Sequence, residues 1–211
     1  MNIGVEIVAD AAAEAAVARI REEVFGREVQ RMLPDLRAYE SDRILTLIAR
    51  NTQTTEPVAA VSVVETTGCE ALHSRFRLPA RPGRRVARYT QLAVRRPFRG
   101  MDVPARLILE ARRLFVVPRS CAYTWLLYDA DHAKSSCLCT LLGFKSGSQT
   151  IQTEYGSSRV LFRDEAAQHA ERWDRNARNH LNGLIPPPAK LALHPMLVSP
   201  APLHENEWLA Q

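Results

Sequence analysis

The 211-residue sequence has no run of eighteen apolar residues, so we expect no membrane-spanning helix. Its first ten residues, MNIGVEIVAD, carry two acids and no basic residue, so we expect no secretory signal peptide. Cysteine is scarce, and the four thiols show no spacing typical of a disulfide framework or a metal site. We therefore expect a cytoplasmic protein without a membrane span or a bound metal.

Lysine is also scarce, at three residues, and the positive charge comes almost entirely from arginine. Thirteen arginines fall between Arg75 and Arg119, where only Asp102 and Glu110 oppose them. Such a block attracts an acidic partner, such as a phosphate or an acidic protein, although a solvated arginine-rich surface explains it as well. The few aromatic residues among these arginines do not form the regular interleaving that a stacking platform requires, so we do not expect nucleic-acid binding.

Hydrophobic periodicity predicts alternating strands and helices. Strands are expected at 3–9, 43–50, 57–65, 86–94 and 121–130 and in a hairpin over 149–164 that turns at Gly156, and helices at 11–31, 103–118, 131–141 and 165–182. This order mixes hairpins with crossover helices. It predicts an α+β fold with a mixed, mostly antiparallel central sheet flanked by helices.

Two motifs connect this order of elements to a known family. LAVRRPFRG (92–100) follows the expected strand, and CLCTLLGF (137–144) closes a short helix. Together with the order of elements, they resemble the GNAT superfamily of N-acyltransferases. The resemblance implies a splayed, bulged strand whose backbone N–H groups around Leu92 and Val94 stabilise an oxyanion, followed by a loop and helix start that bind pyrophosphate.

The same resemblance implies groups that move protons. The family's late motif carries a tyrosine that protonates the leaving thiolate, and Cys139 occupies its place here. A thiol can donate this proton, and a small apolar helix residue is the alternative. His132 stands where the family often has asparagine and is a candidate base, with a helix-start surface histidine as the alternative. Glu65, at the end of its strand, is a further candidate base.

The N-terminal third narrows the match to one branch. R-x-x-V-F-x-x-E, which begins at Arg21 and includes Phe25, is followed by Glu40 and Asp42. These residues resemble the start of acyl-homoserine-lactone synthases and long-chain N-acyl amino acid synthases, which take acyl chains from acyl carrier protein. The resemblance implies that Glu40, Asp42 and Arg21 orient the acceptor amine. A surface ion-pair cluster that holds the loop to the helix is the alternative.

The strand YTQLAV and its neighbours are similar to the E-x-S-R-F-A-V strand of that branch. Arg88 replaces the glutamate and Gln91 replaces the arginine. Gln91 and Phe25 are therefore further candidates for substrate binding. The resemblance covers about residues 5–164. We expect an acyltransferase domain at 1–164, a C-terminal helix at 165–183 and a proline-rich tail at 184–211.

The loop and helix start after Val94, which we call the donor arm, would bind the acyl donor. The donor arm departs from the family pattern, because Asp102 and Pro104 replace two glycines. A carboxylate at a helix start accepts the N–H bonds that a phosphate needs, and proline removes one donor. Helix-start electrostatics favour an anion by only about 0.3–1 kcal/mol, so the arm is weakened for the pyrophosphate of coenzyme A. The single phosphodiester of a carrier protein needs fewer contacts from the donor arm than a pyrophosphate does.

The candidate donor-binding residues therefore include three arginines beside this arm. The full set is Arg95, Arg96, Arg99, Gly100 and Asp102. Ordinary surface arginines next to a helix cap are the alternative.

The sequence thus predicts an N-acyltransferase that moves a fatty acyl group from acyl carrier protein to an amine of an amino acid, metabolite or peptide. The co-substrate is acyl-phosphopantetheine or acyl-coenzyme A, with no tightly bound cofactor. The alternatives are a GNAT enzyme that uses acetyl- or acyl-coenzyme A and a non-catalytic module that kept the fold.

Overall fold

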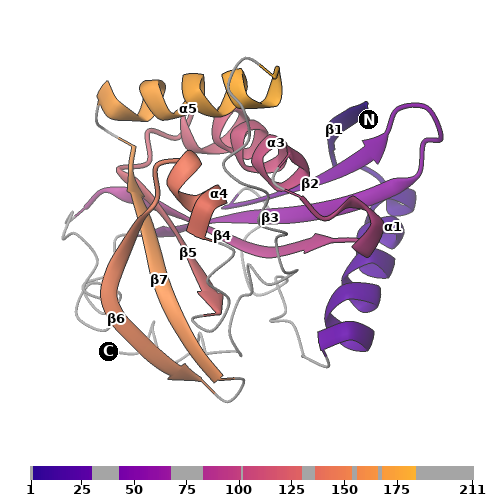
Figure 1. Ribbon diagram of the computed structural model, residues 1–211, viewed down its shortest axis with the longest axis horizontal. Helices are drawn as coiled ribbons and strands as arrows, with labels where there is room; N and C mark the ends of the chain where they lie inside the picture. The colour runs from indigo at the N-terminus through magenta and orange to yellow at the C-terminus, as the bar shows by residue number, and fades with distance from the viewer. Residues whose placement is uncertain are drawn as a thin grey trace.

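The computed structural model describes residues 2–29, 43–67, 83–100, 102–129, 136–153, 156–165 and 168–183. They form one seven-stranded sheet in the order β1-β2-β3-β4-β5-β7-β6, with helices on both faces (Figure 1). The strands are β1 (Ile3–Ile7), β2 (Ile44–Asn51), β3 (Pro57–Thr67), β4 (Arg85–Val94), β5 (Tyr123–Asp129), β6 (Lys145–Thr153) and β7 (Gly156–Asp164). The predicted fold class is confirmed.

Strand pairing follows the sequence pattern. β1 to β4 pair antiparallel with their neighbours, and the predicted hairpins β2–β3 and β6–β7 both form. β4 and β5 are parallel, as their connection through a helix requires. Their apolar stretches are covered on both faces, which is why β4 is buried along nearly its whole length.

Helix α1 (Ala11–Arg21) covers one face of the sheet. Asp10 caps its start, because its side chain accepts a hydrogen bond from the backbone N–H of Ala13 at 2.7 Å. The chain continues as a wider π-helix, η1 (Glu22–Val29), where the sequence predicted one uniform helix over 11–31. Val24 and Phe25 of η1 join the core between α1 and the sheet.

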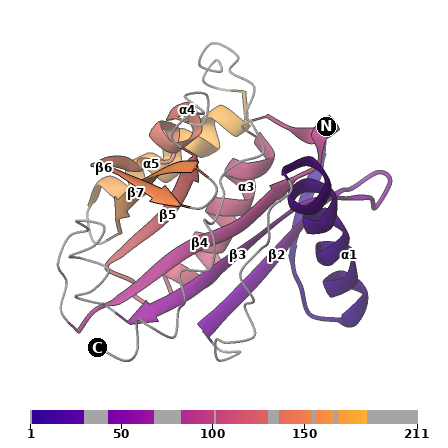
Figure 2. The ribbon, with the colours of Figure 1, turned by 90° about the horizontal axis from the view of Figure 1, so that it is seen from below.

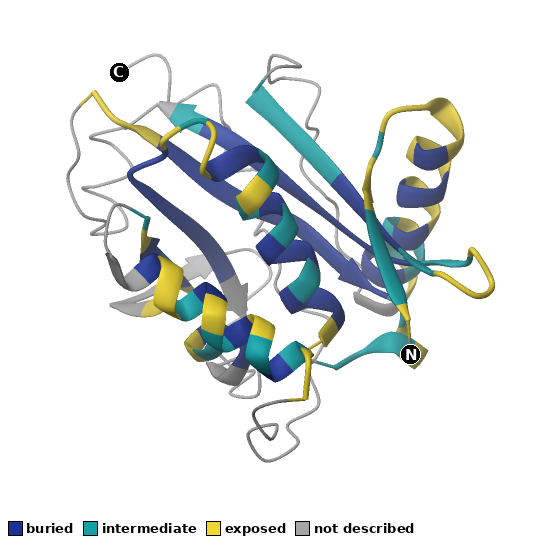
Figure 3. Cartoon of the chain, turned by 90° about the horizontal axis from the view of Figure 1, so that it is seen from above, coloured by how far each residue is buried: buried dark blue, intermediate teal, exposed yellow. Residues whose placement is uncertain are grey.

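Helices α3 (Asp102–Ala111) and α5 (Gln168–Leu181) cover the other face, and their buried positions turn toward the sheet (Figure 3). α3 ends in a π-helical turn, η5 (Arg112–Val116). The short helix α4 (Ser136–Leu141) precedes the LGF motif. The largest core cluster lies on this face and includes Leu47, Val61 and Leu107.

Three sets of contacts hold α5 against the sheet. The ring of Trp173 packs on Gly143, where a Cβ atom would lie 2.4 Å from the indole and where φ is +77°, so only glycine fits this position. Asp174 pairs with Arg112 and with Arg163 of β7, at 2.6 and 2.8 Å. His180 lies against the start of α3. α5 therefore packs as part of the same body as the sheet.

Within the described part of the chain, no helix is long and apolar enough to cross a membrane. The same residues hold no cluster of three or more potential metal ligands.

Candidate functional site

An irregularity in β4 defines the centre of the candidate site. Thr90 pairs with Ser62 and Ala93 pairs with Ala60, so two residues of β4, Gln91 and Leu92, lie opposite the single residue Val61. This is a β-bulge, and Gln91 adopts a positive φ of 52°. Such a conformation is uncommon for a residue other than glycine and is typical of functional sites.

The strands beside the bulge separate. β4 pairs with β5 only at Val86–Arg88, opposite Tyr123–Trp125, and the two strands then diverge (Figure 2). Beyond Arg88, no strand of the described sheet pairs with this edge of β4. Backbone groups around Leu92 and Val94 therefore border an opening in the sheet. The bulge and the splay have the geometry that the resemblance implied for these two residues.

A group of polar side chains lies on the α1 face next to the bulge. Arg21 donates a hydrogen bond from Nη2 to the hydroxyl of Ser62 at 2.7 Å, and Ser62 also bonds Thr46 at 2.7 Å. Thr90, the partner of Ser62 across the strands, is buried, and its hydroxyl has no hydrogen-bond partner in the described structure. We call Arg21, Thr46, Ser62 and Thr90 the polar cluster.

Among the described residues, no acidic side chain balances the charge of Arg21. Its Nε is buried with no hydrogen-bond partner, and no carboxylate of the described residues pairs with it. Burial lowers the pKa of Arg21 to about 10, because a desolvated guanidinium is less stable in its charged form. A buried cation of this kind can bind an anionic group of a ligand.

Two residues extend the polar cluster along β4. The guanidinium of Arg88 lies 5.0 Å from the centre of the Trp125 ring, a cation–π contact across the last paired rung of β4 and β5. The Gln91 side chain is buried at the bulge. The two residues that depart from the E-x-S-R-F-A-V pattern thus flank the point where the strands separate.

Arg95 does not point to solvent as a free phosphate ligand would. Its Nε donates to a Glu23 carboxylate oxygen of η1 at 2.9 Å, and its Nη1 donates to Glu56 of the β2–β3 turn. Burial lowers the pKa of Arg95, but these two carboxylates outweigh it and raise the pKa above its ordinary value. Arg95 therefore connects the end of β4 to η1 and to the β2–β3 hairpin.

The other members of the predicted donor arm lie close together between β4 and α3. Arg99 donates from Nε to the backbone carbonyl of Val94 at 3.1 Å. Arg96 is exposed in the short helix η4 (Arg96–Phe98), and a Cβ atom at Gly100 would meet nothing within 4 Å. The arm is thus open at Gly100, and the described residues offer Arg96 no ion-pair partner.

Asp102 is the first residue of α3, and Pro104 is buried in its first turn. The Asp102 carboxylate lies 3.6 Å from Nε2 of His180 on α5. A negative charge and a missing N–H donor thus stand at the helix start where a pyrophosphate would need positive charge and free N–H groups. The sequence predicted this weakening of the arm, but not the contact from α5.

The other candidate residues from the sequence are either buried in the core or lie outside the described residues. Cys139 on α4 belongs to the same buried cluster as Leu92 and Val94. Phe25 is 1% exposed and packs with Ala60 and Ala93. Glu40, Asp42 and His132, together with the tail at 184–211, lie outside the described residues.

Glu65 is held away from the bulge, at the opposite end of β4. Its carboxylate accepts a hydrogen bond from Nη1 of Arg119 at 2.7 Å and lies 3.6 Å from Nε of Arg85. It also pairs across the sheet with Ala87 rather than with the bulged residues. This arrangement gives Glu65 a structural role.

Sequence reasoning missed most of the polar cluster. Ser62 is the one polar residue in the apolar run PVAAVSVV, and Thr46 is the one polar residue in ILTLIA. Isolated hydroxyls in buried strands were the signal that could have found them, since buried polar groups need partners. Which partner each one takes depends on strand register, which the sequence does not give.

No protein-family model matches the sequence, and no curated protein matches it. Solved structures do match. FeeM, an N-acyl amino acid synthase from uncultured soil microbes, superposes with a TM-score of 0.58 at 14% identity, covering 82% of this chain and 93% of its own. NAA60 from Arabidopsis thaliana, in complex with acetyl-CoA, gives 0.58 at 14% identity, covering 79% and 100%.

A third match is a variant of the spermidine N-acetyltransferase SpeG from Vibrio cholerae, with a TM-score of 0.53 at 9% identity, covering 86% of this chain and 99% of its own. At such low identities the likeness establishes the fold. The chain has the GNAT fold and resembles the N-acyl amino acid synthase FeeM among other N-acyltransferases, as the sequence motifs predicted.

Proposed function

We propose that this protein is an N-acyltransferase that moves a fatty acyl group from the thioester of an acyl carrier protein to the amine of an amino acid, a related metabolite or a peptide. The bulge at Gln91, beside the opening between β4 and β5, carries the proposal. It turns backbone groups of β4 out of the sheet ladder, where they can bind a thioester carbonyl.

The reaction requires three events at this opening. The neutral amine attacks the thioester carbonyl carbon, a C–N bond forms, and the electron pair moves onto the oxygen. Backbone N–H groups around Leu92 and Val94 stabilise that oxyanion. The C–S bond then breaks, the thiolate takes up a proton and the amine nitrogen loses one to a base. Cys139 on α4 is the proposed proton donor and His132 is the proposed base, while Glu40 orients the acceptor amine.

The polar cluster supports an acceptor that carries a carboxylate. Arg21 is a half-buried cation whose Nε is buried, with a hydroxyl partner, Ser62, and no carboxylate partner among the described residues. A buried charge is costly unless it is paired. The α-carboxylate of an amino acid would supply the missing negative charge and would direct the amine toward the bulge.

The donor arm supports a carrier protein over coenzyme A. Asp102 and Pro104 remove features that a pyrophosphate needs, and Arg95 is already occupied by Glu23 and Glu56. Arg96, Arg99 and Gly100 remain as the proposed contacts for a single phosphodiester. The similarity to NAA60 in complex with acetyl-CoA favours a second candidate, a coenzyme A-dependent N-acetyltransferase.

The test is thiol release from palmitoyl-carrier protein, palmitoyl-coenzyme A and acetyl-coenzyme A with a mixture of amino acids, with mass spectrometry of the product. We expect turnover with the carrier protein and an N-acyl amino acid as product. Turnover with coenzyme A thioesters alone would establish the second candidate. No thiol release from any of the three would favour the non-catalytic reading.

A variant pair tests whether the bulge is the site. Deleting Gln91 would leave Tyr89, Thr90, Leu92 and Ala93 alternating regularly between the two faces of the sheet, so the fold should persist while turnover is lost. Gln91→Asn keeps the bulge, because asparagine tolerates positive φ, and should retain turnover. Equal activity of both variants would remove the bulge from the mechanism.

A further inference from the structure

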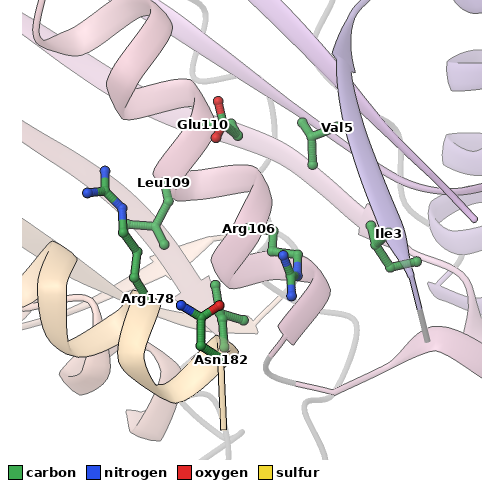
Figure 4. Close-up of a pocket in the computed structure, with 8 residues that line it drawn as sticks. Ile3, Val5, Arg106, Leu109, Glu110, Arg178 and Asn182 are labelled. Carbon is green, nitrogen blue, oxygen red and sulfur yellow. The ribbon is translucent and has the colours of Figure 1, made fainter. Parts of the chain in front are cut away.

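The surface between α3 and α5 contains a groove whose walls come from three elements. Figure 4 shows α3 along its floor, β1 on one side and the end of α5 on the other. Its volume is about 310 Å³. The aliphatic side chains Ile3, Val5, Leu109 and Leu181 line it, together with polar residues of α3 and α5. The contacts of Trp173 with Gly143, in the turn before β6, and of Asp174 with Arg163 of β7 hold the α5 wall in place.

The side chains along the groove carry more positive than negative charge. Arg106 and Arg178 line it, and Arg178 also lines an adjoining hollow of about 490 Å³ with Arg175. None of these three arginines forms an ion pair with any residue that the structure describes.

Most acids near the groove are already paired. Glu110 accepts from Nε of Arg113 at 2.8 Å, and Asp174 is paired with Arg112 and Arg163. Glu171 is the one acid lining the two hollows that has no arginine partner in the described chain. Three cations therefore face one anion over a partly aliphatic floor, and this combination fits an acidic segment with apolar side chains.

The groove begins next to the donor arm. Arg106 follows Asp102 by four residues on α3, about 6 Å along the helix axis, so both lie on the same side of the helix. The last turn of α5 brings His180 to Asp102 and Asn182 to the groove. A macromolecule that lies in the groove can therefore present a tethered group to the arm.

We infer that this groove docks the acidic face of the carrier protein that delivers the acyl group, with Arg106, Arg175 and Arg178 as its contacts. The inference rests on the proposed function for the identity of the partner. Coenzyme A does not explain the groove, because the cations continue along α5 away from the arm. The sequence singled out the arginines of the β4–α3 loop as donor contacts. The proposed docking surface for the carrier protein lies instead on the face between α3 and α5.

The experiment compares the full-length protein with R106E/R175E/R178E and with the control Arg19→Glu. Arg19 is exposed on α1, which covers the opposite face of the sheet. Each protein is titrated calorimetrically with unacylated holo-carrier protein, and turnover is measured with palmitoyl-carrier protein and with palmitoyl-pantetheine, which carries no protein. Sedimentation velocity records the oligomeric state of each variant.

We expect the triple variant to bind the carrier at least about ten-fold more weakly and to raise its KM by a similar factor, because opposed charges attract across such surfaces. Turnover of palmitoyl-pantetheine should be unchanged, and Arg19→Glu should behave as the parent does. The dependence of carrier affinity on salt should also flatten.

Other results would distinguish a failure of the groove from a failure of the proposed function. Carrier binding that the triple variant loses, with no turnover of any donor by the parent, would support the groove and defeat the proposed function. Equal carrier binding by parent and triple variant, or no binding by the parent, would overturn the groove. A change from dimer to monomer in the triple variant would assign the groove to a second copy of this chain and would also overturn the inference.

Discussion

Two buried arginine environments lie on opposite faces of the same sheet, and they differ in how their charge is balanced. On the α5 face, Arg163 contacts Asp174 at 2.8 Å and donates to the carbonyls of Leu142 and Ala170. On the α1 face, Arg21 has Ser62 as its hydrogen-bond partner and no carboxylate in the described structure. Among the described residues, the charge of Arg163 thus has carboxylate partners, whereas that of Arg21 has a hydroxyl partner.

The pKa values show the same contrast. Burial lowers the pKa of Arg112 on the α5 face, but Glu165 and Asp174 outweigh it, so the pKa lies above its ordinary value. Burial lowers the pKa of Arg21 to about 10, and no described carboxylate pairs with it to oppose this shift. The two arginines thus differ in whether described carboxylates offset the cost of burial, and the predictions below test whether this difference separates stability from acceptor binding.

The largest expected effect is a loss of stability on breaking the ion-pair network of Asp174 with Arg112 and Arg163. Arg163→Met removes one cation and leaves Asp174 with a single arginine in a buried setting, so we expect a loss of about 3–5 kcal/mol in the free energy of unfolding. Urea denaturation followed by circular dichroism measures it. A loss below about 1 kcal/mol would mean that the network is not a main source of stability.

Arg21→Met should have the opposite profile. Because the pKa of Arg21 is lowered to about 10, the unfolded chain binds this proton more tightly. The group therefore destabilises the fold at every pH below about 10. We expect an unchanged or higher Tm, with a KM for the amino acid acceptor raised by about ten- to a hundred-fold from loss of a charged contact.

The acceptor assignment would be wrong if Arg21→Met unfolded the protein as Arg163→Met does, or if it left the acceptor KM unchanged. Arg21→Lys serves as the matched control. It keeps the charge and should recover part of the acceptor affinity, although lysine lacks the planar geometry of the guanidinium.

The next prediction concerns the affinity of the donor arm for coenzyme A at the start of α3. Asp102→Gly with Pro104→Ala restores a backbone donor and removes the repelling carboxylate beside His180. We expect coenzyme A to bind about ten-fold more tightly by calorimetry. His180→Gln is the control, since it alters the contact with Asp102 but leaves the carboxylate and Pro104 in place. Identical affinities in all variants would show that these residues do not set donor choice.

The smallest effects compare two buried threonines. Thr124 donates its hydroxyl to Glu165 at 2.7 Å, whereas the Thr90 hydroxyl has no partner in the described structure. Thr124→Val should cost about 1–2 kcal/mol and leave Glu165 with one fewer donor, while Thr90→Val should change stability by less than about 0.5 kcal/mol. Chemical denaturation of both variants measures the difference. Equal costs would remove the distinction between the two faces.

The order of elements was predictable because hydrophobic periodicity records which residues must be buried. The apolar runs 43–50 and 57–65, on either side of a polar turn, predicted the first hairpin, and the spacing after Val103 predicted α3. The two π-helical turns were missed, because the sequence patterns of a π-helix and of the end of an α-helix do not differ over so short a stretch. The motif around Leu92–Gly100 lies where β4 ends and the chain turns into α3, as the sequence predicted, while its role in donor binding stays a prediction.

The site itself depended on long-range geometry. The bulge at Gln91 exists because β3 and β4 pair in a register that sets two residues against Val61, and no local propensity encodes it. The pairing of Arg95 with Glu23 and Glu56 joins segments 72 and 39 residues apart. The sequence did not predict these contacts of Arg95, whose role as a donor ligand stays a prediction.

The sequence by itself determined the secondary structure, the α+β class, the GNAT resemblance and the departure of Asp102 and Pro104 from the glycine pattern, since each of these depends on neighbouring residues along the chain. Only the tertiary structure decided which buried charges are balanced. It gave Arg163 a carboxylate and Arg21 a hydroxyl, and it brought His180 to Asp102. The physical reason is that charge balance depends on distances across the sheet, and these are set by strand register and helix packing.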